Sequence, residues 1–297
     1  MALSIGEYIY DIFRGKWLIG NLIGRGGFGF IYKTSGNNVI KSEQITSVNP
    51  LDTESAFYRT IKEKDKQNFC KIMGINHLGI PKYTIKGESE DKTKQFIVIQ
   101  YIGTSLDKRL ADCGNKFSLK TVLQLTNQLL YILEFLHLHN YSYGDLKSSN
   151  IMTDDINPEN VYLTDFGQCK MYCSSKGIHV KEENKSTVDG TIEFVSRDAH
   201  NGNIVSRTGD LENLLYLIVR WLDGTLPWMS NLNNAFKMKK DFIKDYKSMH
   251  SFVNELLTEI KKNSYTDNPN YAKLRIALLT CADENKITLN NKWDWII

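Results

Sequence analysis

The stretch of sequence that decides the fold is Tyr141–Met152, which reads YSYGDLKSSNIM. It places an acid, a lysine and an amide at fixed offsets: Asp145, Lys147 and Asn150. An aspartate followed five residues later by an asparagine could be an ordinary polar turn. A second motif, Val161–Gly167 (VYLTDFG), strengthens the functional interpretation of this stretch. In it, a short run of β-forming residues is followed by a second acid, Asp165, in a glycine turn.

These side chains supply the groups that phosphoryl transfer from a magnesium nucleotide requires. The carboxylate of Asp145 can take a proton from a hydroxyl group. The amide of Asn150 and the carboxylate of Asp165 are hard oxygen ligands, which Mg²⁺ prefers together with substrate phosphates. The sequence therefore predicts that another segment of the chain binds the phosphates.

A glycine-rich segment, Gly24–Gly29 (GRGGFG), is the candidate phosphate-binding segment. Glycine lets the backbone approach phosphate closely and point its N–H groups at it. The flanks, Trp17–Ile23 and Phe30–Lys33, are rich in β-forming residues and predict a hairpin. A dinucleotide-binding unit would open a helix here and end its next strand in an acid, and this chain does neither. A plain glycine-rich hairpin is the alternative for this segment taken alone.

A lysine and a glutamate follow the glycine-rich segment at a spacing that suits an ion pair. Lys41 ends a short predicted strand, and Glu54 lies in a helix predicted over Thr53–Ile61, with Asp52 or Thr53 as its cap. A pair between this strand and helix would aim the lysine ammonium at a phosphate. Separate, solvated side chains of little energetic value are the alternative for these two residues alone. Their register with the glycine-rich segment favours the pair.

The predicted secondary structure changes near residues 102–103, from mainly strands to mainly helices. Further strands are predicted over 79–84 and 96–102, and a long amphipathic helix over 118–139. An apolar helix opens at Arg207 and is ended by stop residues from Gly224. We therefore predict an α+β fold of two lobes: an N-terminal extension (1–16), a β-rich lobe (17–102) and a mainly helical lobe (103–297).

Composition and charge limit the classes of protein. The 297 residues are 41% hydrophobic and 24% charged, as in soluble globular proteins, and a net charge of +3 gives no argument for direct nucleic-acid binding. Five irregularly spaced cysteines indicate reduced thiols rather than disulfides or a zinc site. The sequence has no signal peptide or myristoylation pattern, and its most apolar run, Leu214–Val219, is too short to cross a bilayer. We expect a soluble, cytoplasmic protein without a membrane anchor.

Together these motifs resemble the signature set of eukaryotic-type protein kinases, from Trp17 to about Leu279. More narrowly, the chain is similar to the vaccinia-related kinases, within the casein kinase 1 group, and most similar to the poxvirus serine/threonine kinase of that family. Ordinary kinases have Ala-Pro-Glu after the activation segment, and this chain has none. The narrower resemblance is carried by Asp189–Phe194 (DGTIEF), Asp198–Gly202 (DAHNG), Gly209–Glu212 (GDLE) and Leu226–Trp228 (LPW).

The resemblance implies a catalytic or metal-binding role for five residues. Asp145 would be the base that receives the hydroxyl proton, and Thr191 would help orient the acceptor. Lys147 would steady the γ-phosphate, as in kinases that act on serine and threonine rather than tyrosine. Asn150 and Asp165 would hold magnesium.

The resemblance also implies a binding site for ATP. Lys41 would bind the α- and β-phosphates with Glu54 as its ion-pair partner, and Ile99 would be the gatekeeper before the hinge, whose backbone meets adenine. The implied nucleotide-binding residues are Ile23, Gly24, Arg25, Gly26, Gly27, Phe28, Gly29, Ile31, Lys41, Glu54, Ile99, Gln100 and Ile102.

Two departures from the family pattern precede Asp145. Gly144 stands where many regulated kinases have an arginine that pairs with a phosphorylated activation loop, so we predict activity without loop phosphorylation. Tyr143 stands where the family usually has histidine, so the packing behind the metal-binding turn is expected to differ from the family pattern.

As partners, the resemblance implies protein substrates with serine or threonine acceptors, among them the barrier-to-autointegration factor. It hence implies support of viral DNA replication in the host cytoplasm.

Two other functions are open to a chain with these motifs. A pseudokinase, which binds or scaffolds, would be expected to lack the phosphate-binding lysine or one of the two aspartates, and all three are present. A small-molecule phosphotransferase of the aminoglycoside type also uses Gly-Asp followed by Asn. Here Lys147, Gly26–Gly29 and Gly190–Thr191 favour a protein substrate. No heptad pattern argues for a dimer, so we expect a monomer.

Overall fold

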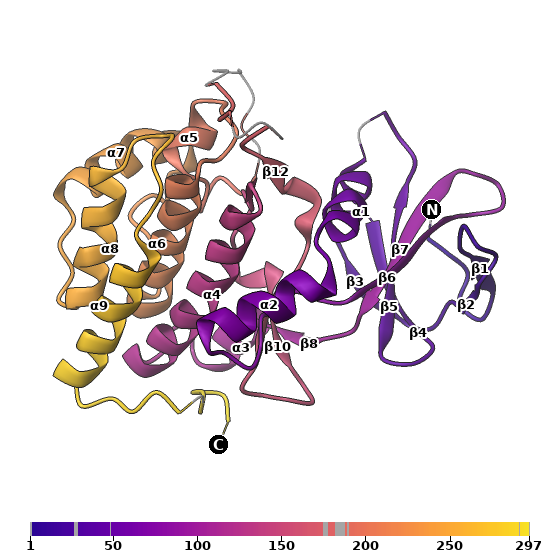
Figure 1. The fold of residues 1–297 in the computed structure, drawn as a ribbon, viewed down its shortest axis with the longest axis horizontal. Helices are drawn as coiled ribbons and strands as arrows, with labels where there is room; N and C mark the ends of the chain where they lie inside the picture. The colour runs from indigo at the N-terminus through magenta and orange to yellow at the C-terminus, as the bar shows by residue number, and fades with distance from the viewer. Residues whose placement is uncertain are drawn as a thin grey trace. The chain divides into compact units, whose positions relative to one another are not determined.

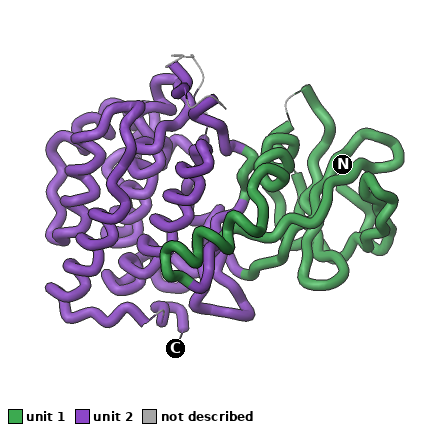
Figure 2. Tube along the Cα trace, viewed as in Figure 1, with its two compact units in different colours: residues 1–75, 80–103, 165–167 green, residues 76–79, 104–164, 168–297 purple. Residues whose placement is uncertain are grey.

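The computed structural model describes residues 2–26, 29–47, 49–174, 178–181, 188, 190–290 and 292–296. The chain divides into two compact units, coloured green and purple in Figure 2. Unit 1 contains residues 1–75, 80–103 and 165–167, and unit 2 contains residues 76–79, 104–164 and 168–297. Asp165 therefore belongs to the same unit as Lys41 and Glu54.

Unit 1 is built on a five-stranded antiparallel sheet with the strand order β3-β4-β5-β7-β6 (Figure 1). β-branched and aromatic side chains form its buried face, with Tyr32, Ile40, Phe96 and Val98 in one apolar cluster. The hairpin expected around the glycine-rich segment is confirmed, because β3 pairs with β4. The strands are β3 (Leu22–Arg25), β4 (Gly29–Thr34), β5 (Asn38–Gln44), β6 (Tyr83–Glu88) and β7 (Lys94–Gln100).

A two-stranded pair precedes this sheet, formed by β1 (Tyr8–Tyr10) and β2 (Lys16–Leu18). Ile9 joins the apolar cluster of the sheet, so residues expected as an N-terminal extension belong to unit 1. The single β-rich run expected over residues 17–23 is divided between β2 and β3. Gly20 lies at the break, where a Cβ atom would come within 2.7 Å of the Lys33 carbonyl oxygen.

The helices of unit 1 are α1 (Pro50–Thr60) and α2 (Glu63–Met73). The predicted start of α1 was wrong: the helix begins at Pro50 with Asn49 as its N-cap, rather than at a cap on Asp52 or Thr53. Proline suits the first helical position because its missing N–H would have no partner there. Phe57 of α1 is buried.

Unit 2 is mainly helical, so the fold is α+β as predicted (Figure 1). The two expected long helices are confirmed as α4 (Leu119–Leu138) and α6 (Arg207–Asp223). Ser118 caps α4, and α6 ends at Gly224, whose φ of +79° is the left-handed conformation that glycine adopts readily. The other helices are α3 (Leu106–Asp112), α5 (Arg197–His200), α7 (Ala235–Asp245), α8 (Ser251–Lys262) and α9 (Tyr271–Glu284).

Short strands hold the motif Tyr141–Met152 in place. Its start is β9 (Tyr141–Ser142), paired with β12 (Lys170–Met171). Its end lies in β10 (Ile151–Asp154), which pairs with β11 (Val161–Leu163), and β8 (Gly103–Ser105) completes that sheet. The loop with the predicted catalytic residues is therefore anchored by a strand pair at each end.

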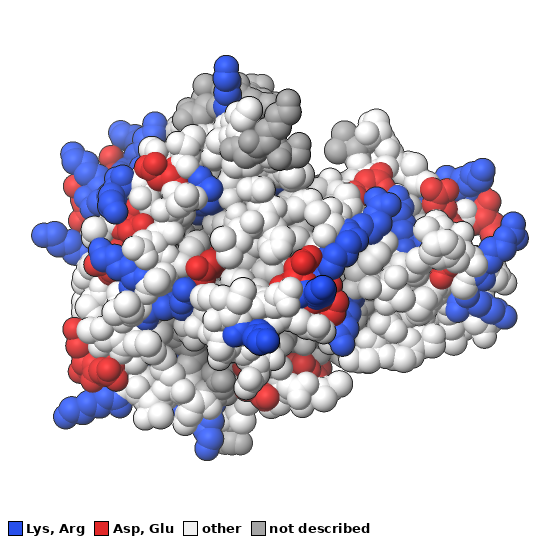
Figure 3. All heavy atoms as spheres, in the orientation of Figure 1, with Lys and Arg blue, Asp and Glu red and all other residues white. Residues whose placement is uncertain are grey.

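On the face shown in Figure 3, basic and acidic side chains are interspersed, as a net charge of +3 suggests. Within the described residues, no helix is both long and apolar enough to cross a membrane.

Candidate active site

Lys41 lies on β5 between two carboxylates of unit 1. Its ammonium nitrogen is 2.6 Å from Oε2 of Glu54 and 2.7 Å from Oδ1 of Asp165. Burial alone would lower the pKa of Lys41, but the charges of Glu54 and then Asp165 raise it above its ordinary value. Burial raises the pKa of Glu54, and the Lys41 ammonium opposes this shift. The predicted strand-to-helix ion pair is confirmed, and the alternative of two separate, solvated side chains is not.

The turn that carries Asp165 is held by buried aromatic rings of unit 1. Phe166 stacks on Phe57 with ring centroids 4.2 Å apart and meets Tyr58 edge to face at 5.4 Å. The Phe166 backbone N–H donates to Oε1 of Glu54 at 3.3 Å. Asp165 itself has a φ of +59°, a left-handed conformation that costs a non-glycine residue roughly 1–2 kcal/mol. Its side chain is 47% exposed, so the strained turn presents a carboxylate that a solvent cation can reach.

The residues predicted to bind the nucleotide lie on neighbouring strands of the unit 1 sheet. Gly24 pairs with Ile31 across β3 and β4, and Ile99 on β7 pairs with Val39 on β5. The Gln100 backbone N–H donates to the Lys82 carbonyl at 2.9 Å. Of the predicted nucleotide-binding residues, Gly27 and Phe28 lie outside the described residues. The described ones are Ile23, Gly24, Arg25, Gly26, Gly29, Ile31, Lys41, Glu54, Ile99, Gln100 and Ile102.

Two glycines of this segment differ in what the fold requires of them. A Cβ atom on Gly29 would lie 2.1 Å from the Ser42 carbonyl oxygen, so the pairing of β4 with β5 requires glycine. A Cβ atom on Gly26 would meet no atom of the described residues within 4 Å. Packing therefore explains why residue 29 is glycine. It does not explain why residue 26 is glycine, which leaves ligand binding as the reason.

We predict that Gly26→Ala leaves the free energy of unfolding within about 0.5 kcal/mol of wild type and raises the KM for ATP several-fold. The added methyl group would occupy space over the sheet rather than clash with the chain. Gly29→Ala is the comparison, because it should lower stability through its clash with Ser42. Thermal denaturation and nucleotide kinetics measure both, and an unchanged KM for Gly26→Ala would contradict a phosphate-binding role.

Four predicted residues of unit 2 meet in one hydrogen-bonded network. Thr191 Oγ1 donates to Oδ1 of Asp145 at 3.0 Å, and Lys147 Nζ donates to Oδ2 at 2.7 Å and to Thr191 Oγ1 at 3.1 Å. Asn150 Nδ2 donates to the Asp145 carbonyl and to its Oδ2 at 3.0 and 3.1 Å. Both carboxylate oxygens of the buried Asp145 are therefore oriented by donors.

The donor set fits magnesium rather than a closed metal cage. Because the amide nitrogen of Asn150 donates to Asp145, its oxygen is the atom left for a cation. Asp165 offers an accessible carboxylate. Among the described residues, no group of three or more histidine, cysteine or acidic side chains could hold a metal ion. Mg²⁺ takes only one or two carboxylates and fills its other positions with phosphate and water, so each of these oxygens, one in each unit, has the chemistry of a magnesium ligand.

Asp210, on α6, is a functional residue to which the sequence analysis gave no role. It is completely buried. It accepts the backbone N–H of Tyr143 at 2.7 Å and that of Gly144 at 2.9 Å. It also accepts Nε2 of His137 at 2.9 Å, so the His137 Nδ1 accepts the Tyr271 hydroxyl at 2.6 Å. An acid in the first turn of a helix that continues with the apolar run Leu214–Val219 is the signal that could have identified it.

Tyr143, the departure from the family histidine, has a specific contact. Its ring is completely buried, and its hydroxyl donates to the Thr164 carbonyl at 2.5 Å. Thr164 immediately precedes Asp165 in the chain. The tyrosine therefore ties the loop that carries Asp145 to the residue that precedes Asp165.

We predict that Tyr143→Phe lowers kcat several-fold and raises the Mg²⁺ concentration needed for half-maximal activity. The change removes one hydrogen bond, worth about 1 kcal/mol, and loosens the start of the turn that carries Asp165. Tyr8→Phe, at an exposed tyrosine of β1, is the matched control. Titration of activity with magnesium tests the prediction, and wild-type behaviour of Tyr143→Phe would show that the hydroxyl has no such part.

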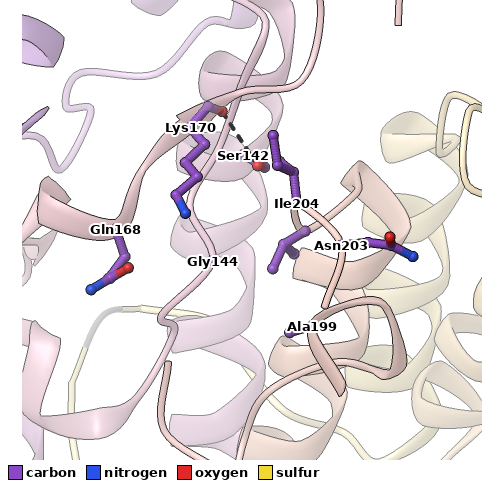
Figure 4. A pocket seen from close by; sticks show the side chains of 8 residues that line it. Ser142, Gly144, Gln168, Lys170, Ala199, Asn203 and Ile204 are labelled. Carbon is purple, nitrogen blue, oxygen red and sulfur yellow. Dashed lines mark hydrogen bonds between the residues drawn. The ribbon is translucent and has the colours of Figure 1, made fainter. Parts of the chain in front are cut away.

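Gly144 is required by the backbone and borders a small cavity. Its φ is +81°, and a Cβ atom would lie 3.4 Å from the Gln168 carbonyl oxygen. The cavity, of about 20 Å³, has room for roughly one water molecule. The residues around this space, shown in Figure 4, come from three separate segments: 142–144, 168–170 and 199–205. Its lining residues are Ser142, Gly144, Gln168, Lys170, Ala199, Asn203, Ile204 and Val205.

Comparison with known proteins gives matches over most of the chain. Residues 17–291 match the family described as "Protein kinase domain". The "B1 kinase" of Vaccinia virus (strain Ankara) is 34% identical over 293 residues, covering 92% of this chain and 97% of that protein. "Serine/threonine-protein kinase VRK2" of Homo sapiens is 36% identical over 241 residues, covering 77% of this chain and 47% of that protein. The solved "Structure of vaccinia related kinase 3" superposes with a TM-score of 0.88 at 27% identity, covering 97% of this chain and 95% of the other.

Proposed function

Because this chain belongs to the protein kinase family, in its vaccinia-related branch, we propose that it transfers the γ-phosphate of ATP to serine or threonine residues of proteins. By the same membership it is a serine/threonine kinase. The observation that carries the proposal is the closed network of Asp145, Lys147, Thr191 and Asn150. It combines a proton acceptor and a cation in one rigid arrangement.

Unit 2 supplies the chemistry on the acceptor side. Thr191 and Lys147 each hold one oxygen of the Asp145 carboxylate, so the carboxylate is oriented before a substrate arrives. An acceptor hydroxyl that donates to Asp145 would be aligned for attack, and its proton would pass to the carboxylate. The Lys147 ammonium would stabilise the negative charge on the group in transfer. Most of the rate enhancement then comes from position and charge.

Unit 1 supplies the chemistry on the nucleotide side. Glu54 is buried, so it holds the Lys41 ammonium in place, and the lysine would bind the α- and β-phosphates. Asp165 would hold Mg²⁺, with Asn150 of unit 2 as the second ligand that the family resemblance implies, and the ion when bound would neutralise charge on the phosphates. Asp165 and Lys41 contact each other, so the metal ligand and the phosphate ligand are aligned by one ion pair.

The test is a transfer assay with ATP labelled on its γ-phosphate, with Asp165→Ala as the inactive control. We expect label on protein from the wild type and none above background from the control. Binding of ATP without transfer by the wild type would favour a pseudokinase scaffold. Consumption of ATP with an aminoglycoside, and no protein product, would favour the small-molecule phosphotransferase.

Activity without activation-loop phosphorylation is a second part of the proposal. Gly144 supports it, because glycine supplies no cation for a loop phosphate at the position where many regulated kinases have arginine. Enzyme treated with phosphatase, and confirmed by mass spectrometry to be free of phosphate, should keep its kcat. Loss of activity after treatment, with recovery after autophosphorylation, would overturn this part.

By family likeness we propose the barrier-to-autointegration factor as a substrate, in the host cytoplasm. The support is the resemblance to the poxvirus kinases. Incubation with that protein and ATP should place phosphate on its N-terminal serine or threonine residues, and Asp145→Ala should not. If the factor stays unmodified while other proteins are labelled, the kinase function stands and this substrate fails. A phosphoproteome of cells with wild type against Asp145→Ala would then identify the substrate.

A further inference from the structure

Lys239 of α7 is completely buried, which is rare for lysine. Its ammonium donates to backbone carbonyl oxygens, that of Ile192 at 2.6 Å and that of Val195 at 2.7 Å. It also lies 3.2 Å from Nε2 of His200 on α5, a helix that neighbours α7 in Figure 1. Burial lowers the pKa of Lys239 to about 7, opposed by the charges of Glu212 and Glu193. An apolar side chain at this position would avoid the free-energy cost of burying an amine. What the amine adds is the pair of hydrogen bonds to the backbone carbonyl groups.

A second buried side chain holds the same segment. Trp228 is completely buried, and its indole N–H donates to the Glu193 carbonyl at 2.7 Å. The Lys239 ammonium lies 5.3 Å from the Trp228 ring centroid and 5.1 Å from that of Tyr216, so two aromatic faces stabilise its charge. Lys239 and Trp228 thus bind three carbonyl groups between residues 192 and 195.

The held segment is a turn that begins at the residue in contact with the catalytic base. The backbone N–H groups of Phe194 and Val195 donate to the Thr191 carbonyl at 2.8 and 2.9 Å. The Thr191 carbonyl group therefore accepts hydrogen bonds from within the turn. The three carbonyl groups between residues 192 and 195 accept theirs from Lys239 and Trp228. Thr191 Oγ1 in turn donates to Asp145. The side chains of residues 191–194 are partly exposed, so this face of the turn is open to a substrate.

We propose that Lys239 is a positioning residue that fixes the turn Thr191–Val195 as a wall for the protein acceptor. This inference rests on the proposed kinase function and deepens it. The lysine acts through the turn: it holds Thr191 in register with Asp145 and shapes the surface on which the acceptor peptide lies. Loss of its carbonyl contacts therefore affects the acceptor and spares the nucleotide.

The experiment compares Lys239→Met with Lys240→Met, which changes the next residue of the same helix at an exposed position. For Lys239→Met we expect kcat/KM for a protein acceptor to fall roughly 10- to 100-fold, the range expected when a reacting group is misplaced. We expect the KM for ATP and the slow hydrolysis of ATP by water to stay within about twofold of wild type, since water needs no acceptor wall. Lys240→Met should match wild type in all three. Trp228→Phe, which removes one of the three carbonyl contacts, should shift the acceptor constants in the same direction.

A purely structural role gives a different pattern. If Lys239→Met lowers acceptor transfer, ATP hydrolysis and ATP affinity together, in proportion to the folded fraction measured by thermal denaturation, the proposal is overturned. Unchanged acceptor kinetics overturn it too. Hydrogen exchange reports on the anchor without activity: the amides of Phe194 and Val195 should exchange faster in Lys239→Met than in wild type. A wild type that transfers no phosphate to protein refutes the kinase function, whereas faster exchange in the variant still identifies Lys239 as the anchor of the turn.

Discussion

Asp145→Asn is expected to lower kcat by roughly 10³-fold, within the range by which a positioned proton acceptor accelerates a reaction. Asparagine has nearly the shape of aspartate but accepts no proton. It also places an N–H₂ group against the donors that now face the carboxylate, Lys147, Asn150 and Thr191. One of these donors must then turn away, so orientation is lost together with the base. The KM for ATP should change little.

Steady-state kinetics with a protein acceptor measure this effect. Asp241→Asn, at an exposed position of α7, removes the same charge elsewhere and should keep wild-type rates. Thermal denaturation of both variants separates loss of chemistry from loss of fold. A variant at position 145 that keeps more than about a tenth of the wild-type kcat would mean that the proton leaves by another route.

Local spacing predicted the parts of the site that lie close together in the chain. Asp145, Lys147 and Asn150 share one loop, so their offsets alone placed them together. Lys41 and Glu54 are joined by one strand and one helix, short enough for spacing and periodicity to suggest the pair. The start of α1 lies earlier than predicted because Pro50 suits the first helical turn, so the helix begins before the polar residues Asp52 and Thr53.

Contacts between distant segments could not be predicted in this way. Tyr143 is 67 residues from Asp210 and 21 from Thr164, and Lys239 is 47 from Ile192. Such hydrogen bonds exist only once helices and strands have packed, and a sequence pattern of period 2 or 3.6 carries no trace of them. Thr191 was identified through the family resemblance rather than through spacing. The burial of Lys239 on α7 likewise depends on the packing of separate segments of the chain.

Asp210→Asn is expected to lower the free energy of unfolding by about 3–5 kcal/mol, the cost of breaking a buried, hydrogen-bonded charge. Asp210 accepts three donors in a site that water does not reach: the N–H groups of Tyr143 and Gly144, and Nε2 of His137. Asparagine offers one oxygen and turns an N–H₂ group toward at least one of these donors, so buried N–H groups face each other.

The same change should reduce activity beyond the loss of folded protein. Tyr143 and Gly144 lead directly into Asp145, so their backbone N–H groups set where the catalytic loop begins. Measured at a temperature where the variant is fully folded, kcat should still fall, because a shift of the loop misplaces the base. Asp223→Asn, at the exposed end of the same helix, is the control that should leave both quantities unchanged. Urea denaturation provides the stability measurement, and a loss smaller than about 1 kcal/mol would mean that the loop is held chiefly by its strands, β9 and β10, rather than by Asp210.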